Sequence, residues 1–311
     1  MRIFEKPHLN IEEQIKLLSE RGLIVDDKDR AKEFLSSISY YRLGYYFRDF
    51  YSDLGKTQFR DGITFEHVLR HYFFDRELRL LVFDAIERLE IAFRTQISYH
   101  YSLNKNDEKW WYTNPKNFKN PERLKLDLSG IQREINRSKE PFIKAYLKNY
   151  DYPELPPSWI TFEVVTMTSI SKIFDNMKLS QEKKDITRHF HLTLPDILES
   201  WMRSISYVRN LCAHHSKLWN RTLILRPMIP RNPVGQWLKV NPLINKMDGE
   251  KQIELERIYV FLSCCIYLLK IINPDTHFIL KFKNLLKQYP EIEMIEMGFP
   301  ALWEDEPLWN S

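Results

Sequence analysis

Apolar residues recur along most of this chain at three- and four-residue steps, which predicts helices that each bury one face. The clearest repeat follows Pro195, a residue tolerated in the first turn of a helix, and Thr193 is placed to cap its start. One face of this helix is apolar, with Ile197, Trp201, Ile205, Val208 and Cys212. The opposite face is polar and carries Glu199, Arg203, Ser206, Asn210 and His214 at helical steps.

Further helices are predicted by the same spacing and by residues that favour a helix start, namely Asn10, Asp27, Thr64, Ser158 and Ser180. They are expected at 10–22, 27–38, from 64 towards 115, near 131–135 and 142–147, at 158–174, from 180, at 250–272 and at 278–288. Proline and β-branched residues are frequent at 222–237, which favours a loop or a short strand pair there. The predicted fold class is therefore all-α, organised as a helical bundle.

The length of 311 residues allows one large domain or two modest ones, and we expect one domain spanning 1–311. Its expected parts are an N-terminal helical part at 1–60, a helical core at 61–225 and a loop with C-terminal helices at 226–311. Asparagine, lysine and proline become frequent at 110–152. This basic excursion is expected to be either a second binding surface or a variable surface insertion.

The composition is typical of a globular protein, because 43% of the residues are hydrophobic and only 8 are glycine. Three cysteines form neither a disulfide framework nor a metal-ligand pattern, and His189 with His191 lacks the other ligands of a metal site. We therefore expect no metal and no cofactor. No signal segment opens the chain and the longest apolar run, 258–269, is too short to cross a membrane, so a soluble cytoplasmic protein is expected.

Positive charge is concentrated around the most regular helix. Between Ser200 and Met247 there are eight Lys and Arg residues and no Asp or Glu. Clustered cations favour a polyanion such as RNA, since neutralising phosphates releases counterions. Trp219 and Trp237 lie within this segment and are expected either to stack on unpaired bases or to belong to the core. The predicted RNA-binding residues are Arg203, His215, Lys217, Arg221 and Arg226.

A ribonuclease site that needs no metal is suggested by Arg209, Asn210 and His214. Imidazole changes charge near neutral pH and can move the proton of a ribose 2′-hydroxyl or of the leaving 5′-oxygen. A guanidinium supplies a permanent charge and several donors for the phosphate oxygens of the transition state. Asn210 lies one turn before His214 and is a candidate to orient the site. Spacing alone leaves a simpler alternative, in which His214 only caps the helix.

The string RNLCAHH at 209–215, followed by LWNR at 218–221, resembles the signature of Abi-like abortive-infection proteins, the AbiD/AbiF group of the HEPN superfamily. The resemblance extends over nearly the whole chain and includes SISYYRLGYYFRDFY at 37–51, LPPSW at 155–159 and the tail GFPALWEDEPLW. It implies a HEPN-like helical core, phage defence by metal-independent RNA cleavage that leaves a 2′,3′-cyclic phosphate, and a site completed by dimerisation. In that reading His214 is the general base or acid and Arg209 stabilises the phosphorane.

Helix geometry constrains this site. Arg209 and His214 are five residues apart, so on an ideal helix they point about 140° apart and do not converge on one phosphate. Either the helix breaks near Ala213, or the two side chains meet across a pair of protomers. A homodimer is expected, because the chain contains one copy of the motif. His215 also falls within the Arg-to-His spacing of the superfamily, so either histidine is a candidate acid–base.

Glu90 and Arg94 are the candidates to support Arg209 from the long helical region that starts at 64. Their four-residue step is most simply that of a solvated ion pair. The alternative is that Glu90 or Arg94 buttresses the motif helix and holds Arg209 in place.

Two further classes of function are open at this stage. The basic face suits a non-cleaving component of a ribonucleoprotein complex regulated by a small noncoding RNA, because phosphate binding needs no acid–base chemistry. The other class is a protein–protein module whose motif histidine is a helix cap.

Overall fold

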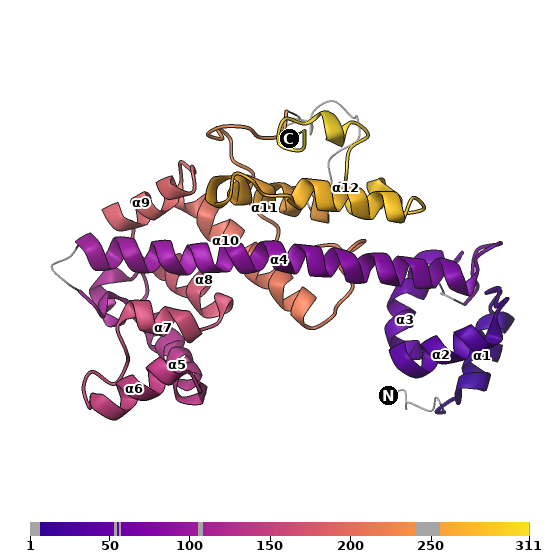
Figure 1. The fold of residues 1–311 in the computed structure, drawn as a ribbon, viewed down its shortest axis with the longest axis horizontal. Coiled ribbons are helices and arrows are strands. Elements are labelled where there is room, and N and C mark those ends of the chain that lie inside the picture. Colours follow the sequence, from indigo (N-terminus) through magenta and orange to yellow (C-terminus); the bar gives the residue numbers. More distant parts are fainter. Residues whose placement is uncertain (1–6, 53–54, 56, 105–107, 240–255, 311) are drawn as a thin grey trace. The chain divides into compact units, whose positions relative to one another are not determined.

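The computed structural model describes residues 7–52, 55, 57–104, 108–239 and 256–310. Within these residues every regular element is a helix, which confirms the predicted all-α class (Figure 1). The α-helices are α1 (Ile11–Glu20), α2 (Lys28–Ile38), α3 (Tyr40–Phe47), α4 (Phe65–Asn104), α5 (Pro121–Arg137), α6 (Pro141–Asn149), α7 (Ser158–Val164), α8 (Met167–Asn176), α9 (Gln181–His189), α10 (Pro195–Ala213), α11 (Ile258–Ile272) and α12 (Phe278–Gln288).

Two compact units make up the chain. The first consists of residues 1–79 and 284–292, and the second of residues 80–283 and 293–311. The residues of α4 and α12 are divided between the two units. The expected single domain at 1–311, with its parts at 1–60, 61–225 and 226–311, stays a prediction.

Side-chain caps begin the helices of the first unit as predicted. Asn10 and Glu13 form a capping box at α1, and the Asp27 side chain accepts a hydrogen bond from the first turn of α2. The aromatic helix α3 buries Tyr46, whose hydroxyl donates to the carboxylate of the buried Asp75 at 2.6 Å. The caps fix where α1 and α2 begin, and the Tyr46–Asp75 bond joins α3 to the first part of α4.

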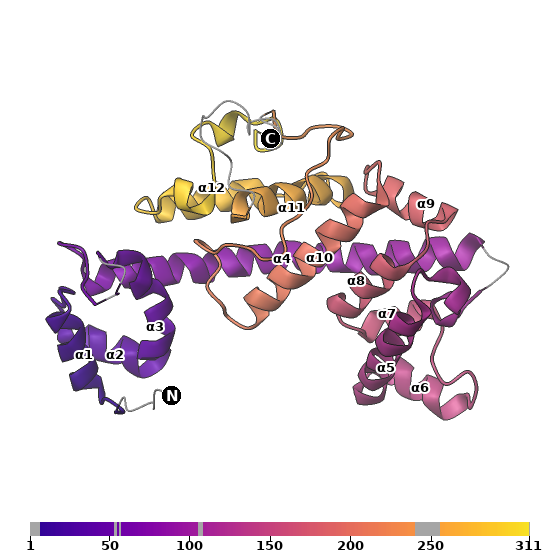
Figure 2. The same ribbon diagram turned by 180° about the vertical axis from the view of Figure 1, so that it is seen from behind.

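Helix α10 is buried on most of its surface in the second unit. It packs against α8, α9 and α11, and both views show it crossing α4 (Figures 1 and 2). Every residue of helix α11 from Ile258 to Leu269 is buried, so this apolar helix is covered on all sides. The apolar face of α10 therefore belongs to the core, as its spacing predicts.

Some predicted helix boundaries are wrong. Helix α10 begins at Pro195 with Leu194 as its N-cap residue instead of Thr193, because the residue before a proline adopts extended backbone. The helix expected at 158–174 is two helices, since Thr166 leaves the helical conformation and caps α8. Helix α11 begins at Ile258, and most of the expected stretch before it lies outside the described residues.

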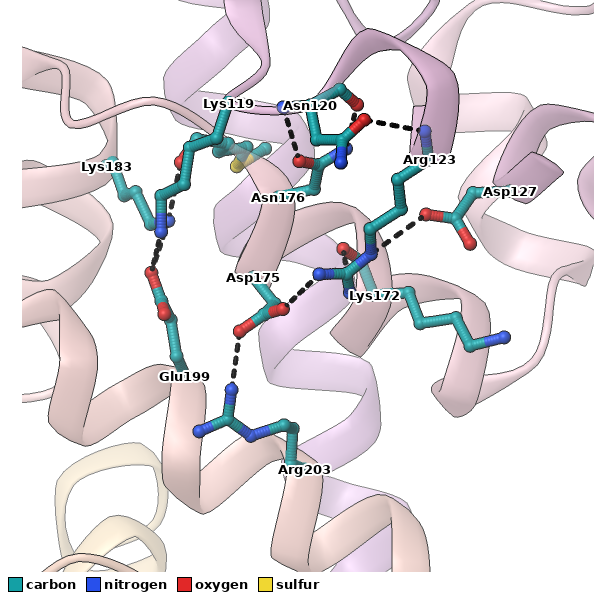
Figure 3. A network of polar contacts seen from close by, with 11 residues as sticks. Lys119, Asn120, Arg123, Asp127, Lys172, Asp175, Asn176, Lys183, Glu199 and Arg203 are labelled. Atoms are coloured by element: carbon teal, nitrogen blue, oxygen red, sulfur yellow. Dashed lines mark hydrogen bonds and ion pairs between the residues drawn. The ribbon is translucent and has the colours of Figure 1, made fainter. Parts of the chain in front are cut away.

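A buried lysine joins α9 to the polar face of α10 (Figure 3). Lys183 Nζ lies 2.5 Å from Glu199 Oε1 and donates to the carbonyl oxygen of Met177 at 2.9 Å. Lys119 reaches the same carboxylate at 3.1 Å. Burial lowers the pKa of Lys183 to about 8, although the Glu199 carboxylate opposes that shift. This end of the polar face is thus paired with other segments instead of being solvated.

Asp175 on α8 receives the next polar side chain of α10 (Figure 3). Arg203 and Arg123 each donate to its carboxylate at 2.6 Å. Burial alone would raise the pKa of Asp175, but the hydrogen bond and charge of Arg123, with the charge of Arg203, outweigh it and lower that pKa. The carboxylate therefore links α5, α8 and α10.

We expect Glu199→Gln to lower the free energy of unfolding by about 3–5 kcal/mol, because the Lys183 ammonium would lose its closest buried counter-charge. Glu122→Gln is the matched control, since Glu122 pairs with Lys125 at the surface and should contribute less than about 1 kcal/mol. Urea unfolding of both variants measures the difference. Equal stabilities would show that the Lys183–Glu199 pair contributes no more than a surface pair.

Candidate active site

Arg209 lies on the side of α10 that faces α4. Its Nε is 3.8 Å from Glu90 Oε2, and its guanidinium carbon is 5.7 Å from the ring centre of Phe83. Phe83 precedes Glu90 by seven residues, so both belong to one face of α4. The guanidinium is therefore held between a carboxylate and an aromatic ring, an arrangement that limits its rotation.

The Glu90 carboxylate also accepts a hydrogen bond from Arg94, which in turn donates to the carbonyl oxygen of Phe162 on α7. The side chains of Glu90 and Arg94 are 15% and 11% exposed. The expectation of a solvated pair is therefore wrong. The structure places Glu90 near Arg209 through one 3.8 Å contact instead of a bidentate pair, and Arg94 reaches Arg209 only through Glu90. The supporting role of the two residues stays a prediction.

Part of the Arg209 side chain remains open. Its Nε is shielded from solvent without a hydrogen bond, whereas 34% of the side chain is exposed. The 3.8 Å distance between Arg209 Nε and Glu90 Oε2 is longer than a hydrogen bond. Glu90 therefore balances the charge of Arg209 without occupying all of its N–H donors. The terminal guanidinium nitrogens can therefore bind an anionic oxygen at the surface.

Asn210 points towards α8 instead of along α10 to His214. Its Nδ2 donates to Thr168 Oγ1 at 3.4 Å, and the same hydroxyl lies 2.9 Å from Ser206 Oγ. Asn210 and Ser206 are one turn apart, so Thr168 bridges two positions of the polar face. The structure thus places Arg209 against α4 and Asn210 against α8, and the predicted orienting role of Asn210 stays a prediction.

Helix α10 ends immediately before His214. The Ser216 N–H donates to the Leu211 carbonyl at 2.9 Å and the His215 N–H to the Cys212 carbonyl at 3.0 Å, which is a Schellman motif. His215 occupies its left-handed position with φ +56°, where glycine is usual. The His214 N–H still donates to the Asn210 carbonyl at 3.0 Å, so the chain leaves the helix only after His214. Both histidines are exposed, and the convergence of Arg209 and His214 on one phosphate stays a prediction.

Several residues predicted to bind RNA already have partners within the protein. Arg203 pairs with Asp175, and Arg226 lies 2.9 Å from Glu256 Oε1. Arg221 donates to the Lys217 carbonyl at 3.2 Å, and Lys217 Nζ lies 5.2 Å from the ring centre of Trp219. Their role in RNA binding is untested by these contacts.

Trp219 and Trp237 are core residues. They are 1% and 6% exposed, so their faces are not available to stack on bases, and only the core alternative holds. Trp237 stacks on Trp201 at 5.7 Å between ring centres, which explains its burial.

Phe83 and Thr168 are site residues that the sequence analysis missed. The signal for Phe83 was present, because Phe83, Glu90 and Arg94 follow at seven- and four-residue steps on one long helix. No comparable signal existed for Thr168, whose position beside Asn210 depends on how α8 and α10 pack.

Two negative findings apply to the described residues only. They contain no group of three or more His, Cys, Asp or Glu side chains arranged to hold a metal ion. Among them, no helix combines the length and the apolar character required to traverse a bilayer.

Comparison with known proteins identifies a family. Residues 33–220 match the family described as Abi-like protein, a span that begins within α2 and contains the end of α10 with both motif histidines. No curated protein and no solved structure matches the chain.

We expect Glu90→Gln to lower the free energy of unfolding by about 1–3 kcal/mol, because Arg94 and Arg209 both lose the charge that they share. Glu87→Gln is the matched control, since Glu87 is an exposed glutamate one turn earlier on α4 and should change stability by less than about 0.5 kcal/mol. Denaturant unfolding compares the two. A Glu90→Gln protein as stable as Glu87→Gln would exclude a supporting role for this carboxylate.

Glycine substitutions at the two histidines should have opposite effects on stability. His215→Gly relieves a left-handed conformation that disfavours side chains by about 1–2 kcal/mol. His214→Gly, at φ −90°, only adds freedom to the unfolded chain and should destabilise by about 0.4–1 kcal/mol. We therefore expect His215→Gly to be the more stable variant in thermal unfolding. The reverse order would mean that the His215 side chain contributes more than its backbone strain.

Proposed function

This chain belongs to the Abi-like family, whose name refers to abortive infection, a phage-defence response, and on this premise we propose that it is a HEPN-type endoribonuclease. The groups at the end of α10 are the main support for this proposal. A guanidinium held by Glu90 and Phe83 lies one and a half turns before two exposed histidines at a helix break. These are the groups that phosphodiester cleavage without a metal requires.

The proposed reaction is an attack within the RNA. His214 takes the proton of a ribose 2′-hydroxyl, and the oxygen forms a bond to the adjacent phosphorus. Arg209 donates to the phosphate oxygens on which negative charge accumulates in the phosphorane. The bond from phosphorus to the 5′-oxygen then breaks, and a second imidazole gives that oxygen a proton. The products are a 2′,3′-cyclic phosphate and a free 5′-hydroxyl.

A homodimer would supply the second imidazole. One chain carries one Arg209 and one His214, and a two-fold axis near the ends of two α10 helices would bring two copies of each together. His215 of the same chain is the alternative second acid–base, because it is exposed beside His214. A stably monomeric protein with full nuclease activity would exclude the dimeric site and leave His215 in that role.

RNA would be held through phosphate contacts around this site, in the cytoplasm. Lys217 and Arg221 follow the motif directly, and the exposed Arg203 and Arg226 extend the basic segment on either side. A small noncoding RNA that binds the same surface is the proposed regulatory partner, since it would compete with the substrate for these cations.

A second candidate function is RNA binding without cleavage, as part of a ribonucleoprotein complex. The ring of His214 favours this second function, because it forms no hydrogen bond with any of the described residues. A general base is usually oriented by a third group. In this alternative the phosphate contacts are the same, but His214 contributes nothing to the reaction rate.

Cleavage of total cellular RNA in EDTA tests the proposal. Wild type should produce 2′,3′-cyclic phosphate ends, and His214→Ala should be at least about 100-fold slower, because it lacks the general base. His189→Ala, which removes an exposed histidine of α9, is the matched control and should cleave like wild type. If all three proteins bind RNA and none cleaves it, the non-cleaving function is correct instead.

A further inference from the structure

A hollow of about 410 Å³ lies between the second half of α4 and α7, both within the second unit. Its walls include Tyr99 and Leu103 from α4 and Trp159 from α7. The volume falls within the range of small-molecule sites, at roughly 300–1,000 Å³. We refer to this hollow as the α4–α7 groove; Figure 1 shows the two helices that form it.

The aromatic walls of the α4–α7 groove are unusually accessible. Tyr99 is 56% exposed and Trp159 is 44% exposed, although both are large rings that proteins tend to bury. The floor is rigid by contrast, because Ser98 and Ser102 lie 3.3 and 3.1 Å from the hydroxyl of the buried Ser158. A lining that combines accessible aromatic rings with serine hydroxyls suits a planar ligand with polar edges.

The charges at the α4–α7 groove argue against an anion or a cation as its occupant. Arg94 and Glu163 are the charged side chains that line it, and they carry opposite signs. The guanidinium of Arg94 is already bonded to Glu90 and to the Phe162 carbonyl. A neutral heteroaromatic ring therefore fits the lining better than a phosphate, and a nucleobase is such a ring.

Side-chain contacts through Arg94 connect the α4–α7 groove with the candidate active site. This residue lines the groove and bonds Glu90, and Glu90 in turn pairs with Arg209. Ser98 follows Glu90 by eight residues, which is about 12 Å along the helix axis. A few nucleotides of single-stranded RNA span that distance, whereas a paired base cannot turn its face into the groove.

We propose that the α4–α7 groove binds one unpaired base of the RNA whose scissile phosphate lies at Arg209 and His214. The proposal rests on the proposed function and assigns it a substrate class, single-stranded RNA. Trp159 and Tyr99 supply the stacking faces, and the groove places a base at a fixed separation from the phosphate. Cleavage then occurs a few nucleotides from an anchored base.

Binding of a labelled single-stranded RNA in the His214→Ala background tests this site, because the RNA stays intact. Stacking on one aromatic ring contributes about 1–3 kcal/mol, so Trp159→Ala should raise the Kd roughly 5- to 150-fold. Trp159→Phe should stay close to the parent, because it keeps an aromatic face. The dependence of Kd on salt should be the same for all variants, since no phosphate contact is removed.

Tyr152→Ala is the matched control, because Tyr152 is an 85% exposed aromatic residue that does not line the α4–α7 groove. If Trp159→Ala binds as tightly as Tyr152→Ala, the base site is excluded while wild-type cleavage still supports the proposed function. If Trp159→Ala weakens binding only by converting a dimer into a monomer in size-exclusion chromatography, a second copy of the chain occupies the groove instead. If the His214→Ala protein binds no RNA, both proposals fail.

Discussion

The polar face of helix α10 pairs with side chains from other segments of the chain, and this constraint organises the second unit. A buried polar group without a partner destabilises a protein by about 1–3 kcal/mol, so the buried Glu199 and Ser206 need specific neighbours. Glu199 forms an ion pair with Lys183, and Arg203 forms an ion pair with Asp175. Asn210 donates a hydrogen bond to Thr168. Rotation or sliding of α10 by one residue would break all of these contacts together.

The fixed register of α10 determines where the candidate chemistry lies. Arg209 can face Glu90 and Phe83 only while its neighbour Asn210 faces α8, because adjacent helical residues point about 100° apart. The Schellman motif then ends the helix at a set residue and turns the two histidines outwards. The site is thus built from a rigid helix end and not from a mobile loop, which suits a constellation that must hold its geometry.

Signals within a few residues of one another predict the helices well. Contacts between segments far apart in sequence are poorly predicted. Asn10, Asp27 and Ser180 cap helices as expected, because a cap involves residues only three apart. At the break between α7 and α8, the Thr166 N–H donates to Glu134 of α5 at 2.9 Å, which is a contact far apart in sequence. The burial of Trp219 likewise depends on the packing of the fold. Arg209 and His214 were found from the motif, whereas Thr168 and the α4–α7 groove follow only from the fold.

The partners of the basic residues are also poorly predicted by the sequence, and these partners affect how RNA would be held in the proposed function. The segment from 200 to 247 contains no acidic residue, yet Arg203, Arg209 and Arg226 each face a carboxylate from elsewhere in the chain. The basic character read from the sequence is therefore partly neutralised on folding. A surface with fewer available charges draws less of its affinity from counterion release, so contacts that are independent of salt must contribute more. In the proposed function, the aromatic faces of the α4–α7 groove would supply such contacts, and this groove without net charge would complement the charged end of α10.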